Sequence, residues 1–174
     1  MKGGSGLAQD ARREWLDAAI TRWEKQLLRL CFAYLGDTAL AEDAVQETFF
    51  KAWKGYDRFR ADSDEKTWLT RIAINTCKDL LKSAWMRNTD RSVSTESLPE
   101  GSVPFDERDD TVTRAVMSLP PKLKEATLLH WYQGMTLNEM AKVLKLPRST
   151  VNYRLKKAKA MLKEKLEDWY HDDE

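Results

Sequence analysis

Residues 136–159 read TLNEMAKVLKLPRSTVNYRLKKAK. Thr136 and Glu139 have the spacing of a capping box, in which each side chain accepts a hydrogen bond from the other residue's backbone N–H. The apolar spacing that follows predicts a short helix, then a turn at residues 145–147, then a second helix from about Arg148 to about Asp168. A short capped helix, a tight turn and a long basic helix together indicate a helix-turn-helix.

The second of these helices carries polar and basic side chains on the face opposite its apolar stripe. The outward residues are Arg148, Ser149, Thr150, Asn152, Tyr153, Lys156, Lys157 and Lys159. The first turns of such a helix enter the major groove, where Asn, Arg and Tyr contact base edges while hydroxyl and backbone N–H groups hold phosphates. An ordinary helical hairpin with a lysine-rich solvent face is the alternative that the pattern leaves open.

The segment before this motif is also predicted to be helical. Leu119-Pro-Pro121 precedes a helix from about Lys122 to Tyr132, because proline is tolerated in a first helical turn. Gly134 follows as a candidate left-handed cap. The C-terminal module therefore spans residues 115–170.

Charge and composition separate this module from the rest of the chain. Residues 115–168 carry 11 basic and 5 acidic residues, a net charge of +6, whereas residues 89–114 carry 3 basic and 7 acidic residues, a net charge of −4. Residues 89–114 are rich in Ser, Pro and acid and poor in apolar residues, which is typical of a flexible linker. An N-terminal module is expected at residues 7–88, and residues 1–88 carry 15 basic and 13 acidic residues, a net charge of +2.

The chain of 174 residues holds only 7 Gly and 5 Pro, which favours long helices over many short strands. We therefore expect an all-α fold of two small helical domains joined by a flexible acidic linker. The second domain is a helix-turn-helix of the winged-helix type without a wing. No run approaches the roughly 20 apolar residues of a membrane span, and residues 1–6 do not resemble a signal peptide, so a cytoplasmic location is expected.

Few residues in the sequence are suited to enzyme chemistry. Cys31 and Cys77 each lie in an apolar helical pattern and are predicted to be core residues. No spacing of Cys, His130, His171 or carboxylates indicates a metal site, and no glycine-rich loop indicates a phosphate site. We expect neither catalytic residues nor a cofactor, a metal or a small-molecule substrate.

Three helices are predicted in the N-terminal module, from about residue 10 to 35, 38 to 53 and 65 to 85. Gly36-Asp37 separates the first two, and a polar loop at residues 55–64 separates the last two. On the third helix the apolar residues predicted to face inward are Trp68, Leu69, Ile72, Ala73, Thr76, Leu80 and Leu81.

Residues 40–54 carry two stripes at helical spacing. The apolar stripe comprises Ala41, Val45, Phe49 and Ala52, with Ala44, Thr48 and Trp53 alongside. A second stripe comprises Asp43, Gln46, Glu47, Phe50 and Lys54. An aromatic ring flanked by charges suits a partner-binding face, but packing of Phe50 under a neighbouring loop is an equally open alternative.

The third predicted helix also has a second face. Arg71, Asn75, Lys78 and Lys82 follow one another at intervals of four and three residues. Cations neutralise phosphates and an amide reads a base edge, so the row suits nucleic acid, although a solvated helix face would look the same. Tyr56, Phe59 and Arg60 in the preceding loop offer stacking surfaces for unpaired bases.

These elements together resemble the extracytoplasmic-function (ECF) sigma factors, two-domain initiation factors of bacterial transcription. Residues 43–49 resemble the helix of that family that binds core polymerase. Phe59-Arg60 and residues 67–79 resemble its segment for melting and reading the minus-ten element, and residues 119–159 resemble its domain for the minus-thirty-five element. At the start of the recognition helix the family often has Gly-Thr-Val where this chain has Ser149-Thr150-Val151.

The resemblance implies roles for individual residues. Polymerase docking is implied for Asp43, Gln46, Glu47 and Phe50. Contact with the minus-ten element is implied for Phe59, Arg60, Asp62, Ser63, Trp68, Arg71, Asn75, Lys78 and Lys82. Contact with the minus-thirty-five element is implied for Arg148, Ser149, Thr150, Asn152, Tyr153, Arg154, Lys156 and Lys157.

The resemblance also implies partners: the clamp helices and the flap of core RNA polymerase, promoter DNA, and an anti-sigma factor that would hold the protein at the membrane when it is not on the nucleoid. The acidic linker would pass through the basic channel that the polymerase provides for RNA. Two other interpretations remain open from the sequence: a stand-alone helix-turn-helix regulator, and an adaptor that binds polymerase but no specific DNA.

Overall fold

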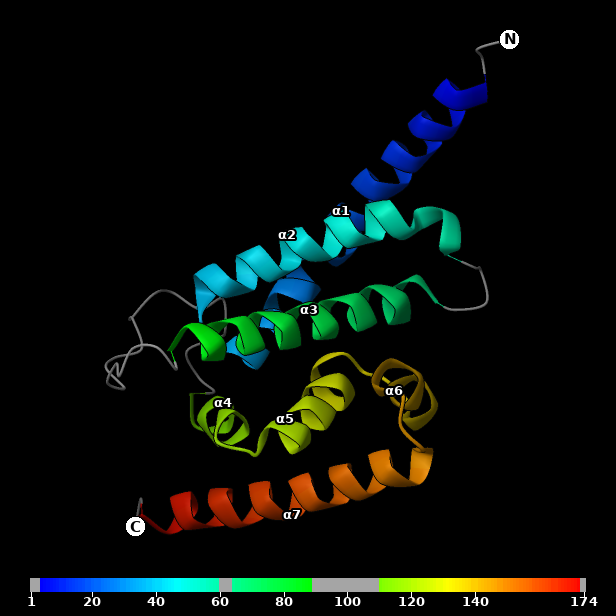
Figure 1. Cartoon of the computed structure of the whole chain (residues 1–174). Helices are drawn as coiled ribbons and strands as arrows, with labels where there is room; N and C mark the ends of the chain where they lie inside the picture. Colours follow the sequence, from blue (N-terminus) through cyan, green and yellow to red (C-terminus); the bar gives the residue numbers. More distant parts are fainter. Residues whose placement is uncertain (1–3, 60–63, 89–109, 173–174) are drawn as a thin grey trace. The chain divides into compact units, whose positions relative to one another are not determined.

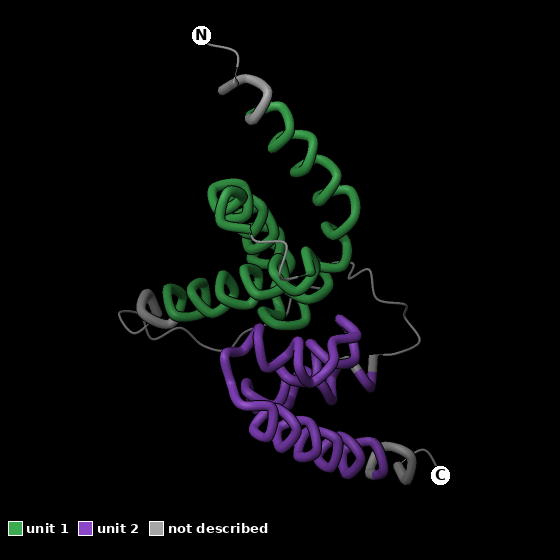
Figure 2. Tube along the Cα trace, turned by 90° about the vertical axis from the view of Figure 1, so that its right-hand side faces the viewer, with its two compact units in different colours: residues 1–98 green, residues 99–174 purple. Residues whose placement is uncertain are grey.

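A computed structural model describes residues 4–59, 64–88 and 110–172, and most of these residues lie in helices (Figure 1). The chain divides into two compact units, residues 1–98 and 99–174 (Figure 2). Every regular element in the described ranges is helical. The all-α prediction with two helical domains is therefore confirmed, whereas most of the predicted linker, residues 89–109, lies outside the described residues.

The first unit is a bundle of three helices: α1 (Gly4–Leu35), α2 (Thr38–Gly55) and α3 (Glu65–Asn88), with the short turn η1 (Tyr56–Arg58) after α2. The boundary between α1 and α2 is the predicted one. Gly36 adopts a left-handed φ of 73°, which ends α1. Asp37 then caps α2, because its carboxylate accepts a hydrogen bond from the Leu40 N–H at 2.8 Å.

The apolar stripe predicted for α2 forms the centre of this unit. The buried residues of α2 are Ala41, Ala44, Val45, Thr48, Phe49 and Ala52. Three of these are alanines with no exposed surface, so the neighbouring helices approach α2 closely. Leu30 and Cys31 of α1 and Leu69, Ala73 and Cys77 of α3 are also fully buried.

The inward face predicted for α3 is partly wrong. Leu81 is 41% exposed and Ile72 and Leu80 are only partly buried, whereas Ile74 and Cys77 are buried. The reason is that α3 packs against both α1 and α2. Its buried surface therefore covers a wider arc than a single apolar stripe, and small or polar residues such as Thr70 fall inside that arc.

The second unit contains α4 (Asp110–Met117), α5 (Pro121–Thr127), the π-helical turn η3 (Leu128–Tyr132), α6 (Leu137–Leu144) and α7 (Arg148–Asp172). Its core includes Leu119, Leu128, Met140 and Val151, which are at most 4% exposed. α4 was not predicted, and it begins within the segment assigned to the linker, since Asp110 is its first residue.

The helix-turn-helix has the predicted local chemistry. Thr136 and Glu139 form the capping box of α6, with both reciprocal hydrogen bonds present. Lys145 adopts a left-handed φ of 53° at the C-cap, which turns the chain toward α7. Gly134, with a φ of 63°, is left-handed as predicted. The single helix predicted for residues 122–132 is instead α5 followed by the wider turn η3.

Candidate polymerase and nucleic-acid interfaces

The second stripe of α2 faces solvent. Asp43, Gln46 and Glu47 are exposed, and Phe50 keeps 50% of its surface accessible. Packing of Phe50 under a loop of its own unit, which the sequence left open, is therefore wrong. The ammonium group of Lys54 lies 4.0 Å from the centre of the Phe50 ring, a cation–π contact that restrains the ring at the surface.

An open groove of about 640 Å³ runs beside this stripe, between α2 and α3. Its lining residues are Asp43, Gln46, Glu47, Phe50 and Lys51 of α2 and Thr76, Asp79, Leu80 and Ser83 of α3. The groove has an aromatic ring and a leucine among carboxylates and amide or hydroxyl groups. Such a surface suits a helix that presents apolar and basic side chains together.

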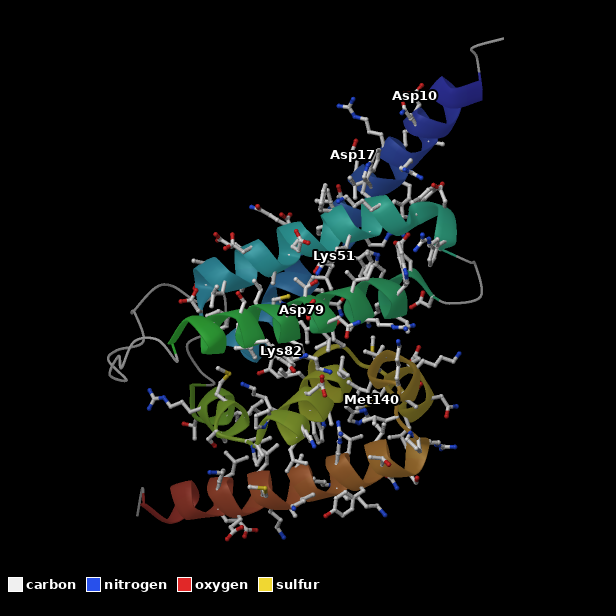
Figure 3. All side chains as sticks on the ribbon, in the orientation of Figure 1. Asp10, Asp17, Lys51, Asp79, Lys82 and Met140 are labelled. Atoms are coloured by element: carbon white, nitrogen blue, oxygen red, sulfur yellow. The ribbon has the colours of Figure 1, made fainter. Side chains whose placement is uncertain are left out.

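Lys51 connects the two walls of this groove. Its Nζ donates a hydrogen bond to Thr76 Oγ1 at 3.1 Å and lies 3.7 Å from Glu47 Oε1 and 3.8 Å from Asp79 Oδ2. Figure 3 labels Lys51 and Asp79 on the adjacent helices. The ammonium group partly neutralises the two carboxylates and restrains Glu47 beside Phe50.

The polar row of α3 lies on a different face from its buried surface. Asn75 and Lys82 are exposed, while Arg71 and Lys78 are partly buried. Residues three and four apart share one face of a helix, so these four side chains form one surface of cations around an amide. This arrangement fits contact with a phosphate backbone and one base edge.

The loop before α3 contributes aromatic side chains. The Phe59 and Trp68 rings, both predicted to contact the minus-ten element, lie 4.7 Å apart between centroids. Arg60, Asp62 and Ser63, predicted to act beside them, lie outside the described residues. Trp15 of α1 also belongs to this cluster, because its ring lies 5.9 Å from Trp68 and 4.9 Å from Tyr56. Sequence reasoning missed Trp15, since no local pattern links a residue near the start of α1 to this loop.

The first turns of α7 carry the residues for which contact with the minus-thirty-five element is predicted. Arg148, Ser149, Lys156 and Lys157 are exposed, and Tyr153 is 62% exposed. Thr150 and Asn152 are partly buried at the edge of the same surface. The ammonium group of Lys157 lies 6.0 Å from the Tyr153 ring centre, so a cation and an aromatic ring lie together on this face.

Arg154 occupies a different place from the one predicted for it. Its side chain is only 14% exposed, and its guanidinium lies 3.6 Å from the carboxylate of Glu125, whose side chain is 5% exposed. Arg154 follows the exposed Tyr153, and successive residues of a helix point in different directions. The side chain of Arg154 therefore points toward α5. The structure therefore gives Arg154 an internal ion pair that joins α5 to α7.

Two groups in the described part of the chain, Cys31 and Lys124, have a clearly shifted pKa. Cys31 and Cys77 are buried free thiols, as predicted for core residues. A hydrogen bond with Cys77, together with burial, raises the pKa of the Cys31 thiol well above its ordinary value. Desolvation lowers the pKa of Lys124. Within the described ranges, His, Cys and carboxylates do not gather into a potential metal-binding group, and no helix there has the length and apolar character to cross a membrane.

Two family models match the chain, one on each unit. The model described as Sigma-70 region 2 matches residues 19–87, and the model described as Sigma-70, region 4 matches residues 109–162.

Among characterised proteins, the RNA polymerase sigma-H factor of Pseudomonas aeruginosa is 30% identical over 165 residues, covering 87% of this chain and 86% of the relative. The ECF RNA polymerase sigma factor SigW of Bacillus subtilis is 28% identical over 174 residues, covering 92% of this chain and 91% of the relative. The ECF RNA polymerase sigma-E factor of Escherichia coli is 30% identical over 164 residues, with coverages of 85% and 84%.

Two solved structures share the fold. One is the sigma factor RpoE in complex with the anti-sigma factor NepR from Bartonella quintana, with a TM-score of 0.69, 24% identity, and coverage of 84% of this chain and 95% of that chain. The other is CnrH in complex with the cytosolic domain of CnrY, with a TM-score of 0.68, 24% identity and coverages of 93% and 96%.

Proposed function

The chain belongs to the extracytoplasmic-function sigma factors of the sigma-70 family, and from this membership we propose how its two units share the recognition of a promoter. It is a transcription initiation factor that directs core RNA polymerase to promoters. The stand-alone regulator that the sequence left open is not favoured, since the first unit matches a sigma-factor region along most of its length.

The first unit binds core polymerase through the second stripe of α2. The observation that carries this proposal is the 50% exposure of Phe50 beside an acidic groove. An exposed aromatic ring is an efficient anchor in an interface, and the carboxylates around it select a basic partner. The clamp helices of the polymerase would supply that partner, with Asp43, Gln46 and Glu47 around the anchor.

The same unit reads the minus-ten element through α3 and the aromatic cluster before it. Asn75 forms a hydrogen bond with an unpaired base, as donor or acceptor. Phe59 and Trp68 offer ring faces on which bases stack. The cations of the same helix, which lie along the DNA backbone, are Arg71, Lys78 and Lys82. Extruding a base from a duplex costs a few kcal/mol, in order of magnitude, and stacking with hydrogen bonds at such a surface offsets that cost.

The second unit reads the minus-thirty-five element as a duplex. The first turns of α7 enter the major groove, and Arg148, Ser149 and Thr150 lie where a helix N-terminus meets phosphates. Asn152 and Tyr153 face base edges, while Lys156 and Lys157 follow the backbone. Arg154 is proposed to hold α7 against α5 rather than to contact DNA, a role supported by the pairing of its guanidinium with Glu125. The polymerase flap binds this unit on another surface.

Binding free energy accounts for the whole function, so the protein acts without catalytic residues. We further propose an anti-sigma partner, since a sigma factor of the same fold has been solved in complex with an anti-sigma factor. The protein would then be cytoplasmic, moving between the nucleoid during initiation and an anti-sigma factor that holds it at the membrane.

Transcription assays with and without core polymerase test the proposal. With core present, the protein should select promoter sequences from a random DNA library, and run-off transcription should start downstream of the selected sites. Core alone should select none of them. Selective duplex binding by the isolated protein, with no added transcription from core, would instead support a regulator.

Substitutions on α2 test the docking surface. Phe50→Ala and Glu47→Lys should each weaken binding to core by about tenfold or more, because an anchor at the centre of an interface typically contributes about 2 kcal/mol or more. Fluorescence anisotropy of the labelled protein with core measures the affinity. Glu24→Lys, an exposed site on α1, is a matched charge reversal that should leave the affinity unchanged.

A further inference from the structure

A single carboxylate joins the start of α3 to α1. Glu65, the first residue of α3, accepts hydrogen bonds from Trp15 Nε1 at 2.9 Å and from Trp23 Nε1 at 2.6 Å. Arg22 Nη1 lies 3.1 Å from the same group. The Glu65 side chain is 19% exposed, whereas that of Arg22 is 60% exposed. The two indole donors are therefore the more protected contacts of this carboxylate.

Trp15 also contacts the residues that precede α3. Its ring lies 4.9 Å from Tyr56, 6.5 Å from Phe59 and 5.9 Å from Trp68 between centroids. One turn earlier on α1, Arg12 pairs with Asp57 and lies over the Tyr56 ring at 5.5 Å. A short stretch of α1 thus touches both η1, before the loop, and the first turns of α3, after it.

These contacts differ from those of the hydrophobic core because they are partly exposed and include directional hydrogen bonds. The fully buried side chains of α1, such as Leu30 and Cys31, lie near its other end, whereas Trp15, Phe59 and Trp68 each keep part of their surface exposed. Apolar packing alone is non-directional, but an indole N–H bonded to a carboxylate fixes the plane of the ring. A ring held in one plane offers a defined stacking face to its neighbours.

We propose that Trp15 and Glu65 are positioning residues for minus-ten recognition. The Glu65 carboxylate fixes the Trp15 indole, and this ring in turn holds Phe59 and Trp68 in the orientation that receives an unpaired base. Neither Trp15 nor Glu65 needs to contact the nucleic acid. The proposal rests on the function proposed above, and it adds α1 to the elements that determine how well the melted strand binds.

The test compares single-strand binding with core binding. The probe is a fluorescent DNA strand selected from a random single-stranded library by wild-type protein bound to core polymerase. Trp15→Phe keeps an aromatic ring but removes the N–H donor, and Glu65→Ala removes the acceptor. Each variant, bound to core, should hold the selected strand about three- to tenfold more weakly, since loss of the hydrogen bond frees the Trp15 ring to leave the plane that supports Phe59 and Trp68.

Four further measurements distinguish positioning from a general structural role. Affinity for core and for the selected duplex minus-thirty-five element should stay within about twofold of wild type, because the residues proposed for those contacts lie elsewhere. Arg22→Ala is the matched control, since it removes only the exposed donor to the same carboxylate, and its effect should be small. Glu65→Gln keeps one acceptor and should recover part of the single-strand affinity.

The outcomes separate this inference from the proposed function. If wild-type protein on core selects no single strand, the proposed function itself fails. If it selects one and both variants bind it as well as wild type, only the positioning role is wrong. A parallel loss of core affinity, duplex affinity and single-strand affinity would also overturn the inference, because it would show a general effect on the fold of the first unit.

Discussion

At the scale of single residues, Glu125 and Arg154 form an ion pair in which the loss of either partner alone is expected to destabilise the second unit. Both side chains are nearly buried. Removing one partner leaves a charge in the interior without compensation, which typically costs about 3–5 kcal/mol. We expect Glu125→Ala to lower the free energy of unfolding of this unit by about 3 kcal/mol, as measured by hydrogen exchange of α5 and α7 amides in the whole chain.

The control for this prediction is an exposed ion pair on the same helix. Lys163 and Glu167 are 3.4 Å apart, four residues from one another, and largely in solvent. Lys163→Ala should change the free energy of unfolding by less than about 0.5 kcal/mol. Replacing Glu125 and Arg154 together by Leu and Met should restore most of the loss. If Glu125→Ala were as mild as Lys163→Ala, the pair would have no structural role.

The Cys31 thiol makes stability depend on pH in the alkaline range. Its pKa is raised in the folded state from an ordinary value of 9.0, first by the hydrogen bond with Cys77 and then by burial. Above pH 9 the unfolded chain therefore loses this proton while the folded chain retains it, so the stabilisation is complete below pH 9 and declines as pH rises. The contribution of one group is at most about 1.4 kcal/mol per pH unit.

Urea unfolding of wild type and Cys31→Ala at pH 7 and pH 10 isolates this contribution. The loss of unfolding free energy between the two pH values should be larger for wild type than for the variant. Tyrosine and lysine titrations are common to both proteins and cancel in the comparison. Equal pH dependence in the two would show that Cys31 ionises as readily in the folded state as in the unfolded chain.

At the scale of elements, α7 combines two kinds of DNA contact that respond differently to substitution. Lys156→Ala should weaken binding of the holoenzyme to all promoters by a similar factor and reduce the salt dependence of binding, since a lysine on phosphate carries no sequence information. Asn152→Ala should instead reduce discrimination at one base pair, by about 1–3 kcal/mol, with little change in salt dependence.

Filter binding to the selected promoter and to its single-base variants, at several salt concentrations, checks both expectations. Lys163→Ala serves as the control, because Lys163 lies about three turns after Asn152 on the same helix. If Asn152→Ala weakened binding to every base variant equally, Asn152 would be a backbone contact and the assignment of base readout to it would be wrong.

Elements that are determined by caps, helix breaks and apolar spacing could be predicted from the sequence. Elements that depend on contacts between distant residues could not. The capping box at Thr136 and Glu139, the break at Gly36-Asp37 and the apolar stripe of α2 all depend on spacing within one turn or two, and each is present. α4 was missed because its first residue, Asp110, is acidic and the helix follows a segment rich in Pro, Ser and acidic residues. The wider turn at η3 was missed because it depends on packing.

The same distinction holds for the candidate sites. The spacing of the second stripe of α2 already predicted that Phe50 faces away from the core. Whether a neighbouring loop covers its ring could be decided only from the structure, in which Phe50 is 50% exposed. Arg154 was misplaced because it is adjacent in sequence to outward residues, whereas its partner Glu125 is on another helix. The bonds of Glu65 to Trp15 and Trp23 join residues more than 40 positions apart, which no spacing rule reaches.

At the scale of the whole molecule, the sequence alternates in charge in a way that matches the proposed division of labour. Residues 115–168, with a net charge of +6, contain the helix-turn-helix, and the acidic residues 89–114, with a net charge of −4, separate it from the first unit. A basic unit is attracted electrostatically to DNA. Salt screens this attraction beyond a distance of about 10 Å at 0.1 M ionic strength. The acidic segment is instead repelled by DNA, so it suits a path through a basic channel.

This argument predicts that the charge of the linker affects initiation more than promoter binding. Glu96→Lys, Glu100→Lys and Asp106→Lys together change the net charge of residues 89–114 from −4 to +2. The variant should bind core and promoter about as well as wild type but yield several-fold less run-off transcript, since like charges in a basic channel repel one another. A variant with residues 89–109 in scrambled order, which keeps length and charge, should transcribe like wild type. Unchanged transcript from the lysine variant would exclude the polyanion role, and equal losses in both variants would point to sequence-specific contacts.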